Sequence, residues 1–323
     1  MRMELAPIIV FAYNRPEHLK KTLTWLSQNE HADESTLFIY CDGPREDASE
    51  EQRGRVEEAR KVARMQQWCR EVHIIESPIN KGLGTSIISG VTEVINKFGR
   101  VIVVEDDLKT SPFFLSYMNK CLDYYKDRKS VFSISGLSRP HPQRFYPKDY
   151  PYDVYVSLSH HPQGWATWED RWNQVDWNAD AYKTVKNNPA ICKAFNRMGA
   201  DYFDALAYQQ ENNQNVWSIR FALSHFVNHA ISICPIQSYI EIFGWGEDST
   251  NCVGNGERWL QTELADKEPD EMLDILYEDD RIINKWYSFS VPKKRNFFQR
   301  LLNRFGGKFL GKDEFILKGK VYD

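Results

Sequence analysis

Three acidic residues, Glu105, Asp106 and Asp107, stand side by side directly after the apolar run 101–104. All four residues of that run are β-branched, which predicts a strand covered on both faces, as in a parallel sheet. Open α/β sheets bind ligands at the carboxyl ends of such strands. Neighbouring carboxylates repel one another, and a divalent cation, which prefers oxygen ligands, relieves that repulsion. The triplet therefore predicts a Mg²⁺ or Mn²⁺ site that would hold a substrate's diphosphate. The alternative is a solvated turn with acidic residues near a helix N-terminus.

Charged residues also follow the other predicted strands of the first half. Arg15 comes after the apolar run 8–12, Asp42 after 37–40 and Lys81 after 72–75. If these strand ends point the same way, they open into one cleft, where basic groups and metal-bound carboxylates suit a nucleoside diphosphate. Taken singly, each has another explanation: Arg15 as a surface residue of a helix, Asp42 as a turn former and Lys81 as a solvated charge in a loop.

The first 135 residues alternate predicted strands with predicted helices. One helix begins near residue 15, the next spans 49–69, and a third runs from 81 to 95. Such alternation requires crossover connections and predicts an α/β fold with a mostly parallel sheet. From about residue 136 the chain becomes rich in Pro, His, Tyr and Trp, with a helical stretch near 180–230 and a short strand at 230–234. The Gly-rich, polar segment 244–257 reads as a mobile loop.

Composition indicates a soluble globular protein, since 42% of the 323 residues are hydrophobic and 27% are charged. Six irregularly spaced cysteines without a C-x-x-C pair favour reduced thiols over a zinc site or a disulfide framework. The N-terminus lacks the apolar stretch of a signal peptide, and no segment reaches the length of a membrane-spanning helix, so we expect a cytoplasmic protein. The net charge of −4 argues against general nucleic-acid binding.

Several common catalytic patterns are missing. The sequence contains no G-x-x-x-x-G-K-[ST], no H-E-x-x-H and no G-x-S-x-G. Gly82-Leu83-Gly84 does not continue as a dinucleotide-binding pattern, and we interpret it as a turn that opens a helix.

Seven segments in order carry a family resemblance: "APIIVFAYNRPEHLKKTL", "FIYCDGP", "NKGLGTSIISGV", "VIVVEDDL", "SISG", "GWATW" and "VWSIRFALSHF". Over roughly residues 5–255 the chain resembles bacterial glycosyltransferases of the GT-A, or nucleotide-diphospho-sugar transferase, fold, which are distantly similar to N-acetylglucosaminyltransferase I. The resemblance implies a Rossmann-like sheet flanked by helices and an acceptor-side C-terminal half. It also implies a metal-dependent, inverting transferase that uses a nucleotide sugar, usually a UDP-sugar.

The resemblance also assigns roles to residues. Asp107 would ligate the metal, Glu105 and Asp106 would contact the ribose or the donor sugar, and Asp42 would bind the nucleoside. Arg15 would contact the nucleotide, and Lys81 a phosphate or the ribose. The remaining positions would line the base pocket (Phe11, Ala12, Tyr13) or form an aromatic region beside the sugar and acceptor (Gly164, Trp165, Trp217).

Two departures affect catalysis. Relatives carry Asp as the presumed base where this chain has Asn215, and His where it has Asn251, just before Cys252. An amide cannot take the acceptor's proton, so general-base catalysis at Asn215 is lost. A neighbouring carboxylate could replace it (Glu211, Glu247 or Asp248), the alignment could be shifted, or the chain could be a weak or inactive relative.

The segment 293–312 carries seven basic residues and no acidic one. Its apolar residues recur at helical spacing (Phe297, Phe298, Leu301, Leu302, Phe305, Phe309), and so do its charges (Arg300, Arg304, Lys308, Lys312). Such a basic amphipathic helix can lie on an anionic membrane, although it can also pack on the protein with its charges in water. This predicts peripheral contact with the inner face of the membrane.

Together these features predict three parts: a nucleotide-sugar-binding half (1–135), an acceptor-binding and catalytic half (136–292) and a basic amphipathic tail (293–323). The predicted activity transfers a sugar from a nucleotide sugar to a glycan or lipid-linked glycan in cell-surface polysaccharide synthesis. The alternatives are a sugar nucleotidyltransferase and a catalytically weak module that binds nucleotides or glycans. A nucleotidyltransferase usually carries a glycine-rich loop after its first strand, where this chain reads Phe-Ala-Tyr-Asn-Arg.

Overall fold

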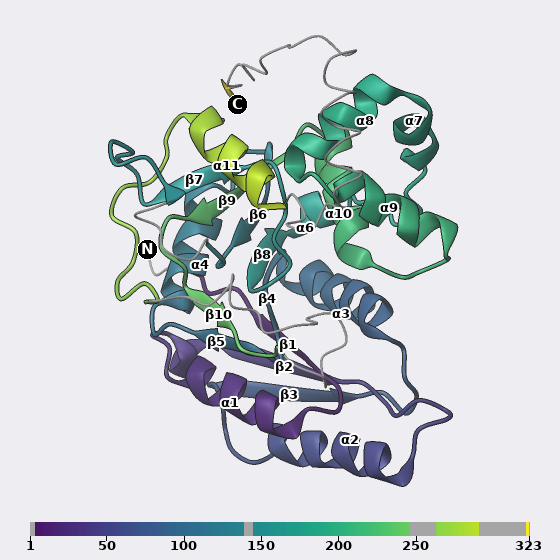
Figure 1. The fold of residues 1–323 in the computed structure, drawn as a ribbon. Helices are drawn as coiled ribbons and strands as arrows, with labels where there is room; N and C mark the ends of the chain where they lie inside the picture. The colour runs from purple at the N-terminus through teal and green to yellow at the C-terminus, as the bar shows by residue number, and fades with distance from the viewer. Residues whose placement is uncertain (1–3, 139–144, 246–262, 291–320, 323) are drawn as a thin grey trace.

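One eight-stranded sheet runs through the centre of the chain, with helices on both of its faces (Figure 1). A computed structural model describes residues 4–138, 145–245, 263–290 and 321–322. The strand order is β3-β2-β1-β4-β8-β6-β9-β7. The strands of this sheet are β1 (Ile8–Ala12), β2 (Thr36–Cys41), β3 (Glu71–Glu76), β4 (Arg100–Glu105), β6 (Val131–Ser135), β7 (Val154–Ser157), β8 (Trp165–Trp168) and β9 (Ile231–Pro235).

Two small antiparallel pairs and a series of helices complete the described structure. The pairs are β5 (Leu108–Thr110) with β10 (Ile240–Ile242), and β11 (Leu276–Tyr277) with β12 (Val321–Tyr322). The helices are α1 (Pro16–Ser27), α2 (Glu50–Ala63), α3 (Leu83–Phe98), α4 (Phe114–Tyr124), α6 (Glu169–Trp172), α7 (Tyr182–Asn187), α8 (Pro189–Phe195), α9 (Tyr202–Glu211), α10 (Trp217–Val227) and α11 (Asp280–Ser290).

The predicted fold class is confirmed. Strands β3, β2, β1 and β4 are mutually parallel, and the predicted helices connect them. Helix α2 is shorter than the predicted span of 49–69, since it ends at Ala63. There the indole N–H of Trp68 donates to the Ala63 carbonyl oxygen at 3.0 Å, and this bond folds the chain back against the end of the helix.

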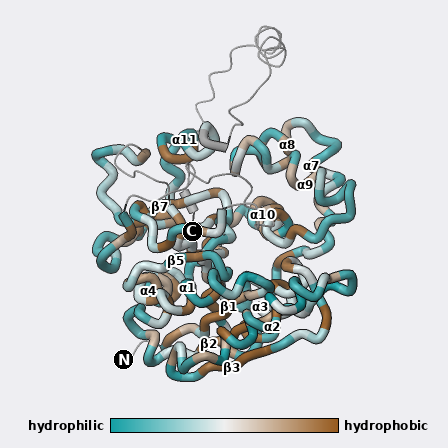
Figure 2. Tube along the Cα trace, turned by 60° about the horizontal axis from the view of Figure 1, so that its bottom comes forward, coloured by the Kyte–Doolittle hydropathy of each residue, from teal (hydrophilic) through white to brown (hydrophobic). Residues whose placement is uncertain are grey.

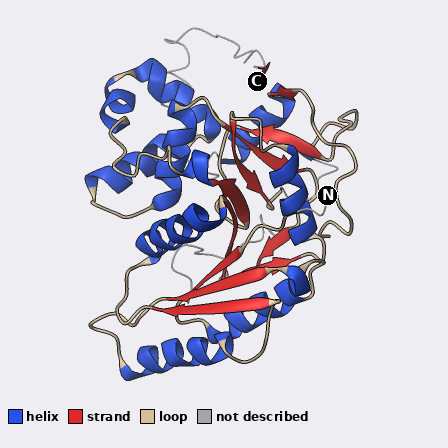
Figure 3. Cartoon of the chain, turned by 180° about the vertical axis from the view of Figure 1, so that it is seen from behind, coloured by secondary structure: helices blue, strands red, loops and turns tan. Residues whose placement is uncertain are grey.

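The sheet separates two apolar layers. Alternate residues of β1 point to opposite faces: Ile8 and Val10 pack with residues of α1 and α4, whereas Ile9 and Phe11 pack with residues of α3 and α10. Hydrophobic residues concentrate on the strands (Figure 2), and the same sheet seen from behind continues from the first half of the chain into the second (Figure 3). The predicted division at residue 135 therefore falls within elements that share one sheet.

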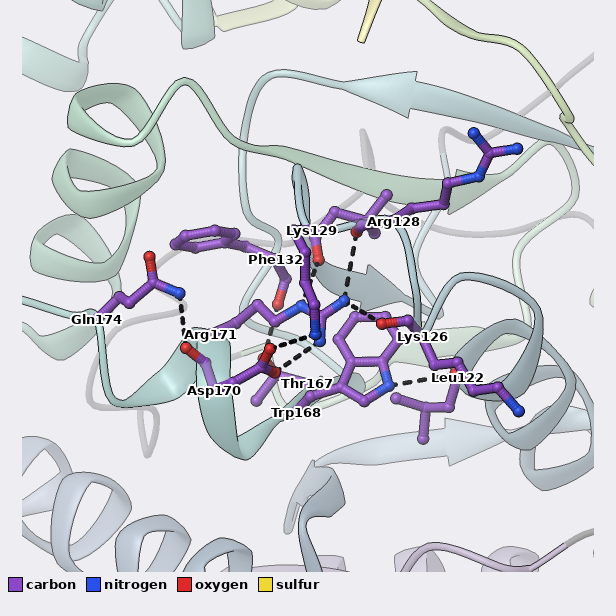
Figure 4. A network of polar contacts seen from close by, with 11 residues as sticks. Leu122, Lys126, Arg128, Lys129, Phe132, Thr167, Trp168, Asp170, Arg171 and Gln174 are labelled. Carbon is purple, nitrogen blue, oxygen red and sulfur yellow. Dashed lines mark hydrogen bonds and ion pairs between the residues drawn. The ribbon is translucent and has the colours of Figure 1, made fainter. Parts of the chain in front are cut away.

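The strand β8 joins the two halves, which the sequence did not predict. It lies between β4 and β6 and is antiparallel to both. Arg171, in the following helix α6, is only 2% exposed and fastens this region (Figure 4). Its guanidinium donates to the carbonyl oxygens of Lys126 (2.5 Å) and Val131 (3.3 Å), lies 4.4 Å from the centre of the Trp168 ring, and pairs with Asp170 at 2.6 Å.

Two further predictions concern the chain as a whole. No disulfide joins the described cysteines, which are Cys41, Cys69, Cys121, Cys192 and Cys234. In the described ranges, no helix has the length and apolar character needed to cross a bilayer. The basic segment 293–312 lies outside the described residues.

Candidate active site

A cavity opens at the carboxyl ends of β1, β2, β3 and β4, beside the first turns of α3. It brings together every residue predicted for the nucleotide and metal site: Phe11, Ala12, Tyr13, Arg15, Asp42, Lys81, Glu105, Asp106 and Asp107. The register of the sheet explains this convergence, since Ala12 pairs with Cys41 and Phe11 with both Tyr40 and Glu105. The parallel strands therefore end level with one another and deliver their following residues to one edge.

Asp42 links the two loops that follow β2 and β3 at the cavity. Its carboxylate accepts backbone N–H bonds from Gly43 (2.9 Å), Lys81 (2.9 Å) and Gly82 (3.0 Å). A Cβ atom at Gly43 would lie 2.5 Å from the backbone of Ile79, so only glycine permits this close crossing of two loops. Asp42 thus fixes the start of α3 against the end of β2, a role that the sequence did not reveal. Because the carboxylate already accepts these three bonds, it could contact a nucleoside only through its remaining lone pairs.

The acidic triplet forms a half-buried cluster in which negative charge is unfavourable. Burial raises the pKa of Glu105 well above its usual range, and the charges of Asp107 and Asp106 raise it further. Burial, with the charge of Asp107, raises the pKa of Asp106 to about 7, against the opposing effects of Arg15 and the Tyr13 backbone N–H. Burial also raises the pKa of Asp107, while Arg15, 3.3 Å from its Oδ2 atom, lowers it. A bound cation would relieve this unfavourable concentration of charge.

The arrangement of these carboxylates bears on the kind of site in which they could hold a cation. Within the part of the chain that the structure describes, no three Asp, Glu, His or Cys side chains converge on one point. A cage of three such side chains is therefore not seen in the described ranges. Mg²⁺, however, is commonly bound by one or two carboxylates together with substrate phosphates and water. The carboxylate of Asp107 at the cavity edge fits that second kind of site.

Gly244, from a distant part of the sequence, contacts two residues that line the cavity, Arg15 and Asp107. The pairing of Ile242 with Leu108 carries the chain from β10 to the acidic triplet, where the Phe243 N–H donates to the Asp107 carbonyl oxygen at 3.1 Å. A Cβ atom at Gly244 would lie 2.2 Å from Asp107 Oδ2. The Gly244 carbonyl oxygen accepts a bond from Arg15 at 2.9 Å. The glycine content of the predicted loop was the only signal of this contact in the sequence.

The far end of the cavity is aromatic and polar. Phe11 and Tyr40 lie with ring centres 5.5 Å apart, and the Tyr40 hydroxyl donates to Glu93 of α3 at 3.0 Å. Burial raises the pKa of Tyr40 above its ordinary value. Other lining residues that the sequence reasoning missed lie near the ends of β2 and β3 or on α3: Arg45, Ile75, Ser77, Asn80, Ser86 and Ser89.

The residues predicted for an aromatic region beside the sugar do not line the cavity. Trp165 is fully buried in β8 and Trp217 is 3% exposed in the first turn of α10, with their ring centres 5.1 Å apart in the core. Gly164 (φ 55°) packs against Ile240, and a Cβ atom there would lie 3.1 Å from that side chain. Trp165 is buried because β8 is an interior strand, and Trp217 of α10 packs against it.

The structure does not support Glu211 or Asn215 as the catalytic base. Glu211, at the exposed end of α9, accepts bonds from Tyr182 and Lys186, both at 2.7 Å, and the Lys186 bond is the main cause of its lowered pKa. Asn215 donates to Thr85 at 2.8 Å and accepts from Arg220. Neither residue lines the cavity. The other two candidates, Glu247 and Asp248, lie outside the described residues, as do Asn251 and Cys252.

The sequence matches no family model. It is 24% identical over 220 residues to an alpha-1,3-mannosyl-glycoprotein 2-beta-N-acetylglucosaminyltransferase of Arabidopsis thaliana. The match includes 60% of this chain and 47% of that enzyme, so the chain spans about half the length of the curated relative. This similarity confirms the resemblance to nucleotide-sugar glycosyltransferases that the motifs indicated, while a bacterial source stays a prediction.

Three solved structures are similar at low TM-scores. Mouse xyloside xylosyltransferase 1 (10% identity, TM-score 0.34) matches 68% of this chain with 80% of its own. UDP-glucose pyrophosphorylase in complex with UDP-glucose (11% identity, TM-score 0.36) matches 72% of this chain with 90% of its own. TarS of S. aureus (11% identity, TM-score 0.37) matches 73% of this chain with 36% of its own. With TM-scores this low, the architecture is judged from the chain's own topology.

Proposed function

We propose that this chain is a glycosyltransferase that moves a sugar from a nucleotide-diphospho-sugar to a hydroxyl group of a glycan. The observation that carries the proposal is a cavity that Arg15 and the acidic triplet line together with the aromatic residues Phe11 and Tyr40. The similarity to the plant N-acetylglucosaminyltransferase supports the same class of reaction.

The order of the strands suggests how the nucleotide would lie. Arg15 and Asp107 follow β1 and β4, whereas Tyr40, Ile75 and Asn80 belong to the ends of β2 and β3. Neighbouring strands are about 4.8 Å apart, so the span from β4 to β3 is roughly 14 Å. That span is on the scale of an extended nucleoside diphosphate. We therefore place the diphosphate at Arg15 and the base against Phe11 and Tyr40.

A divalent cation, Mn²⁺ or Mg²⁺, would supply neutralisation of the leaving diphosphate when bound, with Asp107 as its carboxylate ligand. Arg15 contributes a fixed positive charge at the same end of the cavity. Glu105 and Asp106 line the wall beside the diphosphate, where their carboxyl groups can accept hydrogen bonds from sugar or ribose hydroxyls.

In the proposed transfer, an acceptor hydroxyl oxygen bonds to the anomeric carbon while the bond from that carbon to the diphosphate oxygen breaks. The hydroxyl proton passes to a base. With Glu211 and Asn215 away from the cavity, Glu247 and Asp248 are the remaining carboxylate candidates of those named. Inversion at the anomeric carbon is the outcome that the family resemblance implies.

The finer features rest on the resemblance alone and are part of the proposal. They are a UDP-linked hexosyl or N-acetylhexosaminyl donor, a glycan or lipid-linked acceptor, and a role in cell-surface polysaccharide synthesis. A cytoplasmic location, with peripheral membrane contact through residues 293–312, completes them. A second candidate, a module that binds nucleotide sugars without transferring them, is favoured by Asn215 at the position of the presumed base.

Thermal unfolding with UDP, GDP or CDP, with and without Mn²⁺, tests the donor site on the wild type and on Asp107→Ala. A ligand at about 100 times its Kd adds roughly 2.7 kcal/mol to the free energy of unfolding. We expect a shift with UDP that needs Mn²⁺ and that Asp107→Ala abolishes. The absence of a shift with every nucleotide would remove the basis of the proposal. Slow hydrolysis of UDP-sugars, measured in the same samples, separates a transferase from a binding module.

A further inference from the structure

Arg15 is held by groups from three segments of the chain. It is the residue just before α1, and its guanidinium contacts Asp107 after β4, Gly244 after β10 and His18 in the first turn of α1. The side chains of Arg15 and Asp107 are each only 14% exposed. These contacts determine which guanidinium hydrogens remain for a ligand.

The guanidinium hydrogens can be counted, because arginine has five donors and no acceptor. The Nη2 atom donates to the Gly244 carbonyl oxygen at 2.9 Å and lies 3.2 Å from His18 Nε2, which uses both of its hydrogens. The Nη1 atom donates one hydrogen to Asp107 Oδ2 at 3.3 Å. Among the described residues, the buried Nε has no partner, and one hydrogen on Nη1 is likewise unused. Since Arg15 lines the cavity, the unused Nη1 hydrogen is the one we consider for a ligand there.

The chemistry of the contact fixes the state of His18. Because arginine only donates, His18 Nε2 must be the acceptor, so the imidazole is neutral with its lone pair on that atom. Without this acceptor, Nη2 would have a spare hydrogen, and only Asp107 and Gly244 would hold the guanidinium.

Phe243 fixes His18 in turn. The two rings are stacked, with centres 5.2 Å apart and planes 5° from parallel. The Phe243 ring also meets Trp25 edge-on at 5.1 Å, and Lys21 Nζ lies 5.9 Å from its centre. His18 and Trp25 are seven residues apart on α1 and so share one face of the helix. The chain at Phe243 is thereby seated on α1, which places the Gly244 carbonyl oxygen at Arg15.

We propose that His18 is a positioning residue for the proposed donor site, acting through Arg15. By accepting from Nη2, it directs the free Nη1 hydrogen toward a diphosphate oxygen of the ligand. The inference rests on the proposed function for the identity of the ligand, but its physical content concerns the diphosphate only. It predicts that loss of His18 weakens binding of diphosphates and leaves binding of the nucleoside part unchanged.

The test measures the Kd of UDP, inorganic pyrophosphate and uridine by calorimetry in one Mg²⁺ buffer. His18→Ala should raise the Kd of UDP and pyrophosphate about tenfold, the effect of losing one hydrogen bond to a charged group, and leave uridine within about twofold. His18→Gln, whose amide oxygen can accept the same bond, should stay within about threefold of the wild type. Lys20→Ala, an exposed position on the same helix, is the matched control and should change nothing.

Each other outcome has a defined meaning. Wild-type affinity for both diphosphates in His18→Ala overturns the inference, and so does an equal loss of UDP and uridine, which would mark a merely structural role. If the wild type binds pyrophosphate but not UDP, and His18→Ala weakens that binding, the positioning role stands and the nucleotide proposal fails. If the wild type binds neither, both fail.

Discussion

Replacing Gly244 by alanine should damage the site while sparing the fold. The added Cβ atom would lie 2.2 Å from Asp107 Oδ2 and 2.5 Å from Asp107 Cβ. Rotation of the carboxylate can relieve the first overlap but not the second, because the Cβ atom moves only with the backbone. Ordinary contacts begin near 3.4 Å, so the two segments must separate by about 1 Å.

A displacement of that size has a known consequence for catalysis. Misplacement of a catalytic group by about 1 Å can cost on the order of 100-fold in rate. We expect Gly244→Ala to lower donor hydrolysis or transfer by about that factor and to weaken UDP binding in the presence of Mn²⁺. The cost in the free energy of unfolding should stay within the range of overpacking, about 1–3 kcal/mol.

Gly54→Ala provides the matched control. Gly54 lies within α2, and a Cβ atom there would meet nothing within 4 Å. The same substitution should stabilise the protein by about 0.5–1 kcal/mol and leave UDP binding unchanged. If Gly244→Ala binds UDP as the wild type does and retains its activity, the contact between Gly244 and Asp107 does not shape the donor site.

Two further predictions concern stability. Arg171→Met should lower the free energy of unfolding by about 3–5 kcal/mol in chemical denaturation, because the carbonyl oxygens of Lys126 and Val131 lose their buried donor; a loss below about 1 kcal/mol would contradict this. Asp106→Asn should stabilise the metal-free protein above pH 7. The pKa of Asp106 in the folded protein, about 7, exceeds its unfolded value near 3.9, so stability falls as pH rises through 7. The gain should not exceed about 4 kcal/mol and should shrink toward pH 4, and a gain that does not depend on pH would refute the reasoning.

The first four strands of the sheet could be predicted because each leaves a short apolar run in the sequence, and the runs are clearest in β1 and β4, which are buried along almost their whole length. Pro16 and Gly82 mark the starts of the helices that follow β1 and β3. Since parallel strands of matched register end level, predicting the strands was enough to predict which residues share the cavity.

The remaining features depend on contacts between distant residues. The segment of Trp165 is rich in aromatic residues and reads equally well as a surface loop, and only its pairing with β4 and β6 makes it an interior strand. Gly244 and His18 likewise acquire their places from the pairing of β10 with β5 and from the packing of Phe243 on α1. No local pattern in the sequence encodes such partners.

The position of β8 also governs the order in which the chain can fold as it is synthesised. When residues up to the acidic triplet have emerged, β4 has its parallel neighbour β1 but lacks its second neighbour until residues 165–168 follow. For about sixty residues of synthesis, an apolar strand that ends at the acidic triplet therefore presents an open edge, which is a template for pairing with other chains. A fragment that ends at residue 135 would keep that edge permanently, so the half that carries the acidic triplet depends on the second half to close its own sheet.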